Sequence, residues 1–319
     1  MRPRFIDLGA KDTRSGFGVG LLEAAQRDSR IVALSADLMG SVKMEAFAKH
    51  FPERFFQAGV SEANMIGVAA GLATTGLIPF VGTFANFATG RVYDQIRQSV
   101  CYSKKNVKIA ASHAGLTLGE DGATHQMLED IGMMRGLPEM TVISPCDFNQ
   151  TRLATLAAAQ WEGPVYLRFG RPVVPNFTPA DDPSFEIGKV QVLLSGTDGV
   201  IFATGHMVWH ALQASYALEE KGLSIAVVNV HTLKPVDEMG ILSWLEQTPV
   251  IVTAEEHQVH NGLGDIISHI STKYRPRFVE RVAVQDTFGE SGKPDELLQK
   301  YGLTAHHIIA AVERAIQRK

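Results

Sequence analysis

The feature of this 319-residue chain that most constrains its fold is an alternation of short apolar runs with segments of helical spacing. Short apolar runs bounded by turn residues are typical of buried strands, and strands that alternate with helices form a parallel sheet covered on both faces. We therefore expect an α/β fold. In the first half, the expected strands are residues 30–37, 78–83, 107–111, 140–144 and 165–168, and the expected helices are 12–26, 93–101, 126–135 and 149–161.

A proline-rich stretch divides the chain. Residues 173–183 contain three prolines and no apolar period, which indicates a linker. We therefore expect one domain over residues 1–175, a linker over 176–188 and a smaller α/β domain over 189–319. In this second domain, the expected strands are residues 199–205, 224–230, 250–256 and 280–284, and the expected helices are 207–221, 264–272 and 305–317.

Composition excludes several classes of function. The net charge of −4 provides no overall positive field for nucleic acid or for an anionic membrane surface. No segment approaches the ~18 consecutive apolar residues that span a bilayer, and the first residues contain no apolar signal-peptide core. The two cysteines, Cys101 and Cys146, have neither disulfide-framework nor zinc-ligand spacing. We therefore expect a soluble, cytoplasmic protein with small-molecule ligands.

Polar residues follow several of the expected strands. Asp37, the turn at Thr83, the turn at Ser112-His113 and Arg168 all lie at carboxyl ends of strands, where parallel sheets bind ligands. One dinucleotide-like pattern is misleading. Glycines at 16, 18 and 20, followed by Asp37, imitate a dinucleotide fingerprint, but no strand precedes them, so we do not expect a nucleotide there.

Residues 55–65 lead into the small-residue segment 66–73 and place Glu62 at the start of a nearly uncharged helix. The helix dipole favours an ionised carboxylate there, whereas burial would favour the protonated form. Ser61-Glu62 is therefore either ordinary helix capping or a tuned acid, and this stretch alone leaves both readings open.

Two further features carry polar or aromatic groups. Phe84 and Phe87 are spaced to present both rings to one flat ligand, although such pairs also occur in cores. Residues 113–126 form a glycine-rich loop with two histidines and two acids, of the kind that holds binding groups. Its spacing fits no compact metal motif, so hydroxyl recognition and proton transfer are the favoured roles.

Read in order, these residues resemble the carboxyl-terminal half of a transketolase. The resemblance rests on Ala36-Asp37, Val60-Ser61-Glu62-Ala63-Asn64, residues 82–87, the Gly-Glu-Asp-Gly-Ala-Thr-His-Gln run at 119–126, and Leu167-Arg168. It covers essentially the whole chain. It implies a parallel-sheet thiamine-diphosphate pyrimidine-binding domain followed by the transketolase C-terminal domain, as in a subunit of a split bacterial transketolase.

The resemblance also implies roles for the residues that match. Glu62 corresponds to the glutamate that hydrogen-bonds the cofactor's aminopyrimidine, a role that requires a shared proton. Phe84 and Phe87 correspond to aromatics around the pyrimidine, and Asp37 to an acid beside the cofactor. A third aromatic in familiar transketolases corresponds here to Gly90, which puts that wall of the pocket in doubt.

Substrate-binding roles follow in the same way. Residues that hold the sugar phosphate correspond to Arg14, Ser41, His113 and Arg168. Two guanidiniums, a hydroxyl and an imidazole suit a phosphate dianion. Asp121 corresponds to a residue that reads a substrate hydroxyl, and His125 to a residue near the reacting carbons.

One family motif is missing from the sequence. The family holds the cofactor's diphosphate through a divalent cation bound by a Gly-Asp-Gly motif, and this chain has no such motif. The resemblance therefore implies a separate amino-terminal subunit that supplies the diphosphate domain, most simply in an α2β2 assembly. Its oxygen ligands would select Mg²⁺ or Ca²⁺, with no metal ligands in this chain.

The expected reaction transfers a two-carbon ketol unit from a ketose phosphate to an aldose or aldose phosphate, as in the pentose phosphate pathway of carbohydrate metabolism. Related alternatives are a subunit like 1-deoxy-xylulose-5-phosphate synthase or like the beta chain of a 2-oxo acid dehydrogenase. The full phosphate-binding set and Ser-Glu-Ala-Asn favour the transketolase. A non-catalytic scaffolding paralogue is the alternative from another class, and the intact Glu62, Asp121 and His125 argue against it.

Overall fold

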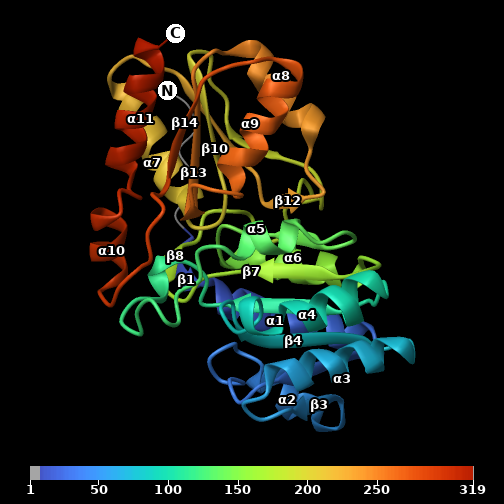
Figure 1. Ribbon diagram of the computed structural model, residues 1–319. Coiled ribbons are helices and arrows are strands. Elements are labelled where there is room, and N and C mark those ends of the chain that lie inside the picture. Colours follow the sequence, from blue (N-terminus) through green and yellow to red (C-terminus); the bar gives the residue numbers. More distant parts are fainter. Residues whose placement is uncertain (1–7, 319) are drawn as a thin grey trace.

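The computed structural model describes residues 8–318, which form two α/β units stacked on one another (Figure 1). The sheet of the first unit has six parallel strands, and a seventh, β12, pairs antiparallel at one edge within the described chain. Parallel pairing with helices on both faces confirms the expected fold class. In spatial order the strands are β12 (Thr232–Lys234), β6 (Thr141–Ile143), β7 (Val165–Arg168), β5 (Lys108–Ser112), β4 (Ile78–Phe84), β2 (Ile31–Ser35) and β3 (Phe55–Gln57).

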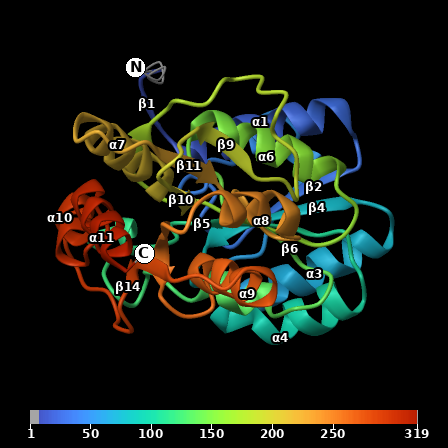
Figure 2. The same cartoon turned by 90° about the horizontal axis from the view of Figure 1, so that it is seen from above.

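Helices cover both faces of this sheet (Figure 2). One face carries α1 (Thr13–Arg27) and α6 (Phe148–Gln160). The other carries α3 (Glu62–Thr74), α4 (Tyr93–Gln95) with the π-helical η3 (Ile96–Tyr102), and α5 (Asp130–Arg135). The short helix α2 (Glu45–His50) and the 3₁₀ turn η1 (Pro52–Arg54) connect β2 to β3.

The glycines at positions 16, 18 and 20 lie inside α1 and serve packing. A Cβ atom at Gly16 would clash with the Phe148 carbonyl of α6, and one at Gly18 would clash with the Lys43 carbonyl. The absence of side chains lets α1 approach its neighbours closely. Contrary to expectation, a strand, β1 (Ala10–Asp12), does precede α1, but among the described residues it pairs with β8 (Val173–Pro175) and stands outside the parallel sheet. The close helix contacts account for these glycines.

The second unit has a five-stranded sheet within the described residues, with four parallel strands and β9 antiparallel at the edge. Alternate side chains of its strands face two helix layers: α7 and α11 on one side, α8 and α9 on the other. In spatial order the strands are β14 (Val279–Val284), β13 (Ile251–Gln258), β10 (Gly199–Ala203), β11 (Ile225–Asn229) and β9 (Gln191–Leu194). The helices are α7 (Met207–Glu220), α8 (Glu238–Gln247), α9 (Leu263–Tyr274), α10 (Pro294–Lys300) and α11 (Ala305–Gln317).

The two units are joined by more than a linker. Strand β12 comes from the second unit and extends the sheet of the first, and an apolar cluster continues from one unit into the other. Strands β1 (Ala10–Asp12) and β8 (Val173–Pro175) pair antiparallel. Just beyond β8, the Asp147 carboxylate accepts hydrogen bonds from the Phe177 and Thr178 amides at 2.8 and 2.7 Å. The start of the expected linker is therefore held against the first unit.

Several elements differ from the expectation. Helix α5 begins at Asp130 and not at Gln126, because residues 126–129 form extended and turn backbone. The expected helix over 93–101 is helical but changes to π geometry at Ile96. No helix of residues 8–318 is both long and apolar enough to cross a membrane. Both cysteines are buried and free.

Candidate active site

The carboxyl ends of three neighbouring strands meet the start of α3 at one edge of the first sheet. Asp37 follows β2, Phe84 ends β4 one residue after Thr83, and His113 follows β5, so three of the four expected strand ends lie side by side there, although Thr83 is still within its strand. A pocket of about 460 Å³ opens at this edge. It is lined by Ala36, Asp37, Leu38, Val60, Glu62, Phe87, Arg91, Thr124 and His125.

Glu62 is the buried acid of this pocket. Its side chain is only 3% exposed, although it is the first residue of α3. The preceding Ser61 makes no side-chain capping bond, so helix capping does not account for this Ser-Glu pair. Arg91 donates from Nη1 to Glu62 Oε2 at 3.1 Å, and 53% of the Arg91 side chain remains exposed. Arg91 is thus the charged partner of the Glu62 carboxylate. Because half of the Arg91 side chain is exposed, solvent can accommodate it in other rotamers.

A row of rings runs from this pocket toward β5. The rings of Phe84 and Phe87 are nearly parallel, with centroids 5.8 Å apart and an interplanar angle of 17°. His113 stacks on Phe84 at 3.8 Å, and His125 meets Phe87 edge-on at 5.4 Å. The Arg91 guanidinium lies 4.5 Å from the Phe87 centroid. Phe87 is therefore part of the pocket wall, whereas Phe84 is buried behind it between the Phe87 and His113 rings.

Beyond His113 lies a cationic end of the site. Arg14 donates from Nη1 to the Ser41 carbonyl at 3.0 Å, and its Nε lies 3.3 Å from Asp12 Oδ1. Burial lowers the pKa of Arg14, and the nearby Arg171 guanidinium lowers it further. Burial, with Arg14 and Arg171 close by, also lowers the pKa of His113 to about 3. His113 is therefore neutral near pH 7, so the positive charge comes from the arginines alone.

Arg171 is a residue that the sequence interpretation missed. It donates from Nη1 to the Leu118 carbonyl at 2.6 Å and to Glu120 Oε2 at 2.8 Å. Its charge acts on both Arg14 and His113, which places it at the cationic end. The signal that points to it is its position just past the end of β7, after Phe169-Gly170.

Arg168 does not lie where we expected it. Strand alternation places it on the same face of β7 as the buried Tyr166, toward α5. Its Nε donates to Asp130 Oδ2 at 2.8 Å and its Nη2 to the Glu256 carbonyl at 2.9 Å. Burial opposes its charge, but Asp130 more than compensates and raises the pKa of Arg168. Its guanidinium is therefore committed to the interior and does not join the cationic end.

The loop over 113–126 delivers one expected residue to the pocket and not the other. His125 lines the pocket, and its Nδ1 lies 3.0 Å from Thr124 Oγ1. Asn86 donates to the Thr124 carbonyl at 2.6 Å, which holds this part of the loop over the ring row. Asp121 is exposed and does not line the pocket.

Comparison with family models decides the identity of both units. The transketolase pyrimidine-binding domain matches residues 9–176, and the transketolase C-terminal domain matches residues 188–308. The chain belongs to the transketolase family. Since the first domain is the one that binds the pyrimidine of thiamine diphosphate, the cofactor of this transketolase section is thiamine diphosphate.

Relatives that match over nearly their whole length show which section of a transketolase this is. A protein of Methanocaldococcus jannaschii described as a transketolase C-terminal section is 44% identical over 97% of this chain and 98% of its own. A 6-deoxy-6-sulfo-D-fructose transketolase subunit of Clostridium sp. (strain MSTE9) is 44% identical over 94% and 92%. A split-gene transketolase solved as an inactive beta tetramer superimposes with a TM-score of 0.90, at 47% identity over 96% and 98%. The chain is therefore the C-terminal section of a split transketolase, whose partner is an N-terminal subunit.

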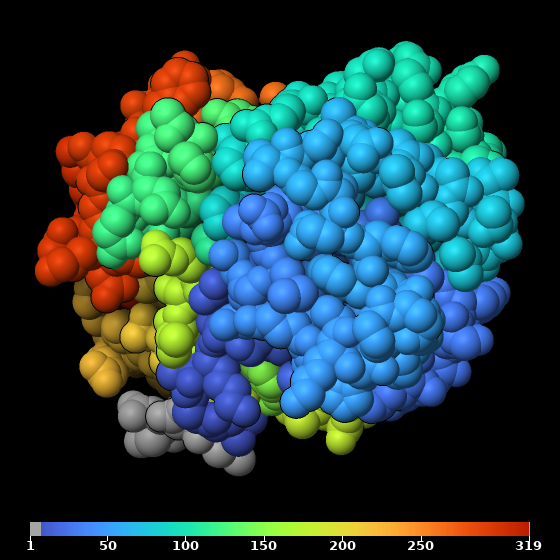
Figure 3. Space-filling model, turned by 90° about the horizontal axis from the view of Figure 1, so that it is seen from below, coloured from blue at the N-terminus to red at the C-terminus, as the bar shows by residue number. Residues whose placement is uncertain are grey.

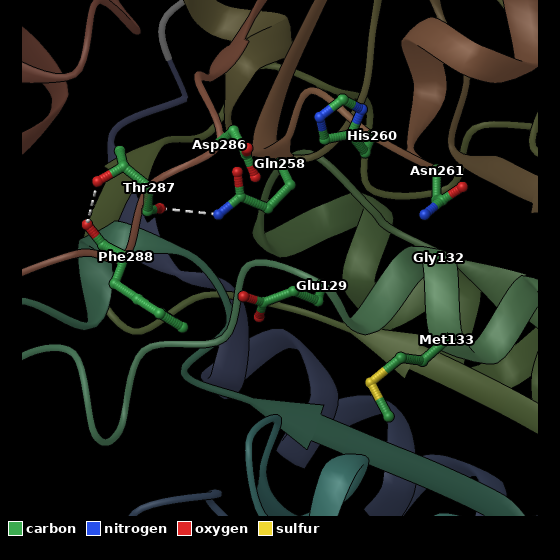
Figure 4. A pocket seen from close by; sticks show the side chains of 9 residues that line it. All are labelled: Glu129, Gly132, Met133, Gln258, His260, Asn261, Asp286, Thr287 and Phe288. Carbon is green, nitrogen blue, oxygen red and sulfur yellow. Dashed lines mark hydrogen bonds between the residues drawn. The ribbon is translucent and has the colours of Figure 1, made fainter.

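A second pocket, of about 310 Å³, lies between the two domains of this transketolase section (Figure 4). In Figure 4 the Gln258 amide points toward Thr287, whose carbonyl accepts a hydrogen bond from Nε2 at 2.8 Å. No expected site residue is among its lining, and within residues 8–318 no three His, Cys, Asp or Glu side chains gather to hold a metal. The lining residues are Glu129, Gly132, Met133, Gln258, His260, Asn261, Asp286, Thr287 and Phe288.

Proposed function

We propose that this chain supplies the pyrimidine side of a transketolase active site and, with its N-terminal partner, transfers a two-carbon ketol unit from a ketose phosphate to an aldose or aldose phosphate. The observation that carries the proposal is the buried Glu62 carboxylate in a pocket walled by Phe87, from which a row of packed rings leads to His113 beside Arg14 and Arg171. A buried acid at one end and a cationic cluster at the other suit a phosphorylated substrate bound beside a cofactor.

The residues present fit the pyrimidine half of thiamine diphosphate. A flat heteroaromatic ring needs an apolar ring face and a partner for a ring nitrogen, and the pocket offers the Phe87 face beside the buried Glu62 carboxyl. Asp37 lines the same pocket from the end of β2. When bound, the cofactor supplies the carbon nucleophile that accepts the two-carbon unit.

Glu62 acts in this proposal by sharing a proton with a pyrimidine nitrogen. Such an acid works best when water is excluded and its proton is easily exchanged. In the structure, Arg91 donates a hydrogen bond to the Glu62 carboxylate and its guanidinium covers the face of the Phe87 ring. We infer that Arg91 swings away when the holoenzyme assembles, which its half-exposed side chain permits.

The substrate would extend from Glu62 toward the cationic end. His125, on the pocket wall, would move or hold a proton near the reacting carbons. Asp121 would read a substrate hydroxyl from the loop. Arg14 and Arg171 would bind the phosphate, with Ser41 and the neutral His113 contributing hydrogen bonds. Arg171 takes the role first expected of Arg168.

The partner would complete the cofactor site. The chain has no Gly-Asp-Gly motif, so the N-terminal subunit would hold the diphosphate and its Mg²⁺ or Ca²⁺. Self-association into α2β2 has a plausible surface, because α3 exposes an uncharged face of Asn64, Gly67, Val68 and Gly71. Unpaired, buried cysteines suit a reducing, cytoplasmic location.

The anionic group of the substrate is open to a direct test. Because one relative is a sulfosugar transketolase subunit, sulfonate and phosphate are both tetrahedral anions to examine at the Arg14–Arg171 end. A panel of phosphorylated, sulfonated and uncharged ketoses, each assayed with the reconstituted complex, separates these substrate classes by kcat/KM. We expect the phosphorylated donor to be the best.

The proposal is tested by mixing the chain with its N-terminal partner, thiamine diphosphate and Mg²⁺. Ketol transfer from a ketose phosphate is expected only from the mixture. Turnover by this chain alone would overturn the split-site proposal. Reaction with pyruvate but not with a ketose would instead indicate the synthase-like or dehydrogenase-like alternatives, and complex formation without any turnover would indicate a scaffold.

A further inference from the structure

The C-terminal domain contributes no residue to the pocket around Glu62 within the described chain, yet it holds the loop that does. The loop over 113–126 begins at His113 and ends beside His125, and it lies directly against the carboxyl-terminal segment (Figure 3). A loop of this length, rich in glycine, has a large conformational entropy that must be offset by contacts. The first domain supplies some of those contacts through Asn86 and Arg171, and the second domain supplies others.

The main contact is made by Glu256, a buried carboxylate of β13. Its Oε1 accepts a hydrogen bond from the Thr117 amide at 2.7 Å, in the 3₁₀ turn η4 (Leu116–Leu118). The same carboxylate fills the space beside Gly115, where a Cβ atom would clash with it. Gly115 has a φ of +88°, so both its backbone conformation and its contact with Glu256 require glycine.

Further contacts hold the rest of the loop. Gln126 donates from Nε2 to the Leu116 carbonyl at 3.1 Å and to the Glu290 carbonyl at 2.9 Å, which ties the loop's two ends to the segment after β14. A Cβ atom at Gly122 would clash with Ser291 Oγ. Leu116 is buried in the apolar cluster that contains Leu297 and Leu298 of α10. The loop is thus attached at its start, middle and end.

The backbone of Glu256 is itself held by the first domain. The backbone carbonyl of Glu256 accepts from Arg168, and the imidazole of His206 lies 3.9 Å from its Oε2. Arg168 also forms an ion pair with Asp130 of the first domain, so the hydrogen bond from Arg168 to the Glu256 carbonyl fixes β13 relative to the first domain. The anchor of the loop therefore spans both domains.

We propose that the C-terminal domain is a positioning element for the substrate-binding loop, and that Glu256 is the residue through which it acts. Glu256 orders the turn at Thr117, and this order fixes His113 at the cationic end and His125 at the pocket. Loss of the Glu256 contact leaves the loop attached to the first domain but free to sample other conformations. The kinetic part of this inference rests on the proposed function, and the structural part does not.

The neighbouring Glu255 is a matched control. It is also a fully buried acid on β13, and its carboxylate accepts from the Leu263 and Gly264 amides at 2.7 and 2.8 Å. Those donors begin α9, inside the C-terminal domain. Replacing Glu255 therefore removes a comparable buried contact without touching the loop.

Amide hydrogen exchange on the full chain tests the structural part. In Glu256→Ala we expect exchange over residues 115–118 to accelerate about tenfold or more, because a buried donor loses a charged acceptor. Glu255→Ala should accelerate exchange at the start of α9 and leave 115–118 protected. Unchanged protection of 115–118 in Glu256→Ala, or equal loss in both variants, would overturn the proposal.

Two milder variants serve if Glu256→Ala does not fold. Glu256→Gln retains an acceptor oxygen but loses the charge, so exchange over residues 115–118 should be about threefold or more faster than in the parent chain. Gln126→Ala removes the second attachment and should raise exchange over the same loop about threefold or more, as expected for a neutral hydrogen bond. Protection of residues 115–118 in Glu256→Gln equal to that of the parent chain would show that the Glu256 charge does not position the loop. An unchanged loop in Gln126→Ala would show that the contact with the segment after β14 does not hold it either.

Kinetics of the reconstituted complex test the functional part. Glu256→Ala should raise KM for the sugar phosphate about tenfold and leave the affinity for thiamine diphosphate unchanged, with partial rescue by Glu256→Gln. Glu255→Ala should lower the melting temperature without this change in KM. Absence of ketol transfer by the parent complex would refute the proposed function and leave the exchange result standing. An active parent complex with unchanged KM in Glu256→Ala would refute the positioning role.

Discussion

Two buried acid–arginine pairs lie on the same side of the first sheet, and they are built for opposite purposes. Glu62 and Arg91 meet at 3.1 Å, with the acid 3% and the arginine 53% exposed. Asp130 and Arg168 meet at 2.8 Å and are 0% and 6% exposed. Tyr166 also donates to Asp130, and the Glu256 carbonyl holds Arg168. The first pair has a further contact through the Arg91 guanidinium over the Phe87 ring, whereas both members of the second pair make further hydrogen bonds in the interior.

The difference separates a replaceable partner from a permanent one. Removing one member of a fully buried pair leaves the other charge buried without a partner, which costs several kcal/mol of folding free energy. A half-exposed arginine that loses its partner can instead be solvated by water. An acid in a ligand pocket needs a replaceable partner, such as a half-exposed arginine. The Glu62 pair is therefore suited to function, and the Asp130 pair to holding the two domains in register.

The largest expected effect is on catalysis at the open pair. Glu62→Gln in the reconstituted complex should reduce kcat by about 10²–10⁴-fold, because the shared proton is lost. The free energy of unfolding should change by less than about 1 kcal/mol, since its partner is half in water. Steady-state assays and urea denaturation measure both. Full activity in this variant would remove Glu62 from the mechanism.

The closed pair should respond in the opposite sense. Arg168→Met leaves the Asp130 carboxylate buried without its cation and should lower the free energy of unfolding by about 3–5 kcal/mol. At low temperature the folded fraction should keep a KM for sugar phosphate close to that of the parent. A stable variant with a greatly raised KM, in which amide exchange over residues 115–118 stays that of the parent, would return Arg168 to the substrate site.

For Arg171, in contrast to Arg168, we expect a change in substrate binding. Arg171→Ala should raise KM for a sugar phosphate about 10–100-fold, the usual weight of a charged hydrogen bond, and affect an uncharged aldehyde acceptor little. Arg171→Lys, which keeps the charge but loses the planar fork, should fall between the two. Equal losses for charged and uncharged acceptors would show that Arg171 only fixes Leu118 and Glu120.

Acid should destabilise the fold through His206, a buried histidine near Arg168. Burial, with Arg168 nearby, lowers the pKa of His206 from 6.5 to about 4. As the pH falls, the His206 imidazole is therefore protonated in the unfolded chain before it is protonated in the folded chain. The stability that neutral His206 contributes is present above pH 6.5 and falls as the pH drops toward 4. By linkage the parent chain should lose about 2 kcal/mol more than His206→Leu between pH 7 and pH 5. Denaturation at both pH values measures the difference, and identical curves would contradict it.

The smallest effect is expected at Arg91. Because Arg91 contacts the Glu62 carboxylate and the Phe87 ring that the cofactor would contact, Arg91→Ala should strengthen thiamine diphosphate binding to the complex about two- to fivefold, as for an exposed ion pair. Calorimetric titration of the complex gives the affinity directly. Weaker binding would mean that Arg91 stays in the holoenzyme and forms the wall that Gly90 leaves open.

The sequence predicted the central strands well because buried parallel strands are continuous apolar runs between turn signals. It missed β9 and β12, which lie at sheet edges, and β3, whose side chains are mostly exposed. Such short edge strands form because a neighbour is present, and their own residues carry little periodic signal. The helix expected from Gln126 was too long because Gln126 is bonded to Leu116 and Glu290, a tertiary contact without any local pattern.

The site was predictable to the extent that chemistry follows strand ends. Glu62, Phe87 and His125 do come together, and Asp37 joins them. Arg168 and Arg171 could not be distinguished by residue type, since both are arginines near the end of β7. Their roles depend on which face of the sheet holds Asp130, and the partner of a buried charge lies far away in the sequence. Arg91 could not be anticipated at all, because its position depends on an exposed side chain folding back over Phe87.

Strand β12 has a consequence for separating the domains. It belongs to the C-terminal domain but covers the β6 edge of the first sheet. A chain shortened after residue 188 would leave β6 with unpaired amides and carbonyls along an apolar strand, which is a template for pairing between molecules. The shortened protein should therefore aggregate or form new oligomers even though its own helices and active-site residues are intact. In this subunit the second domain therefore also prevents the β6 edge of one molecule from pairing with a strand of another.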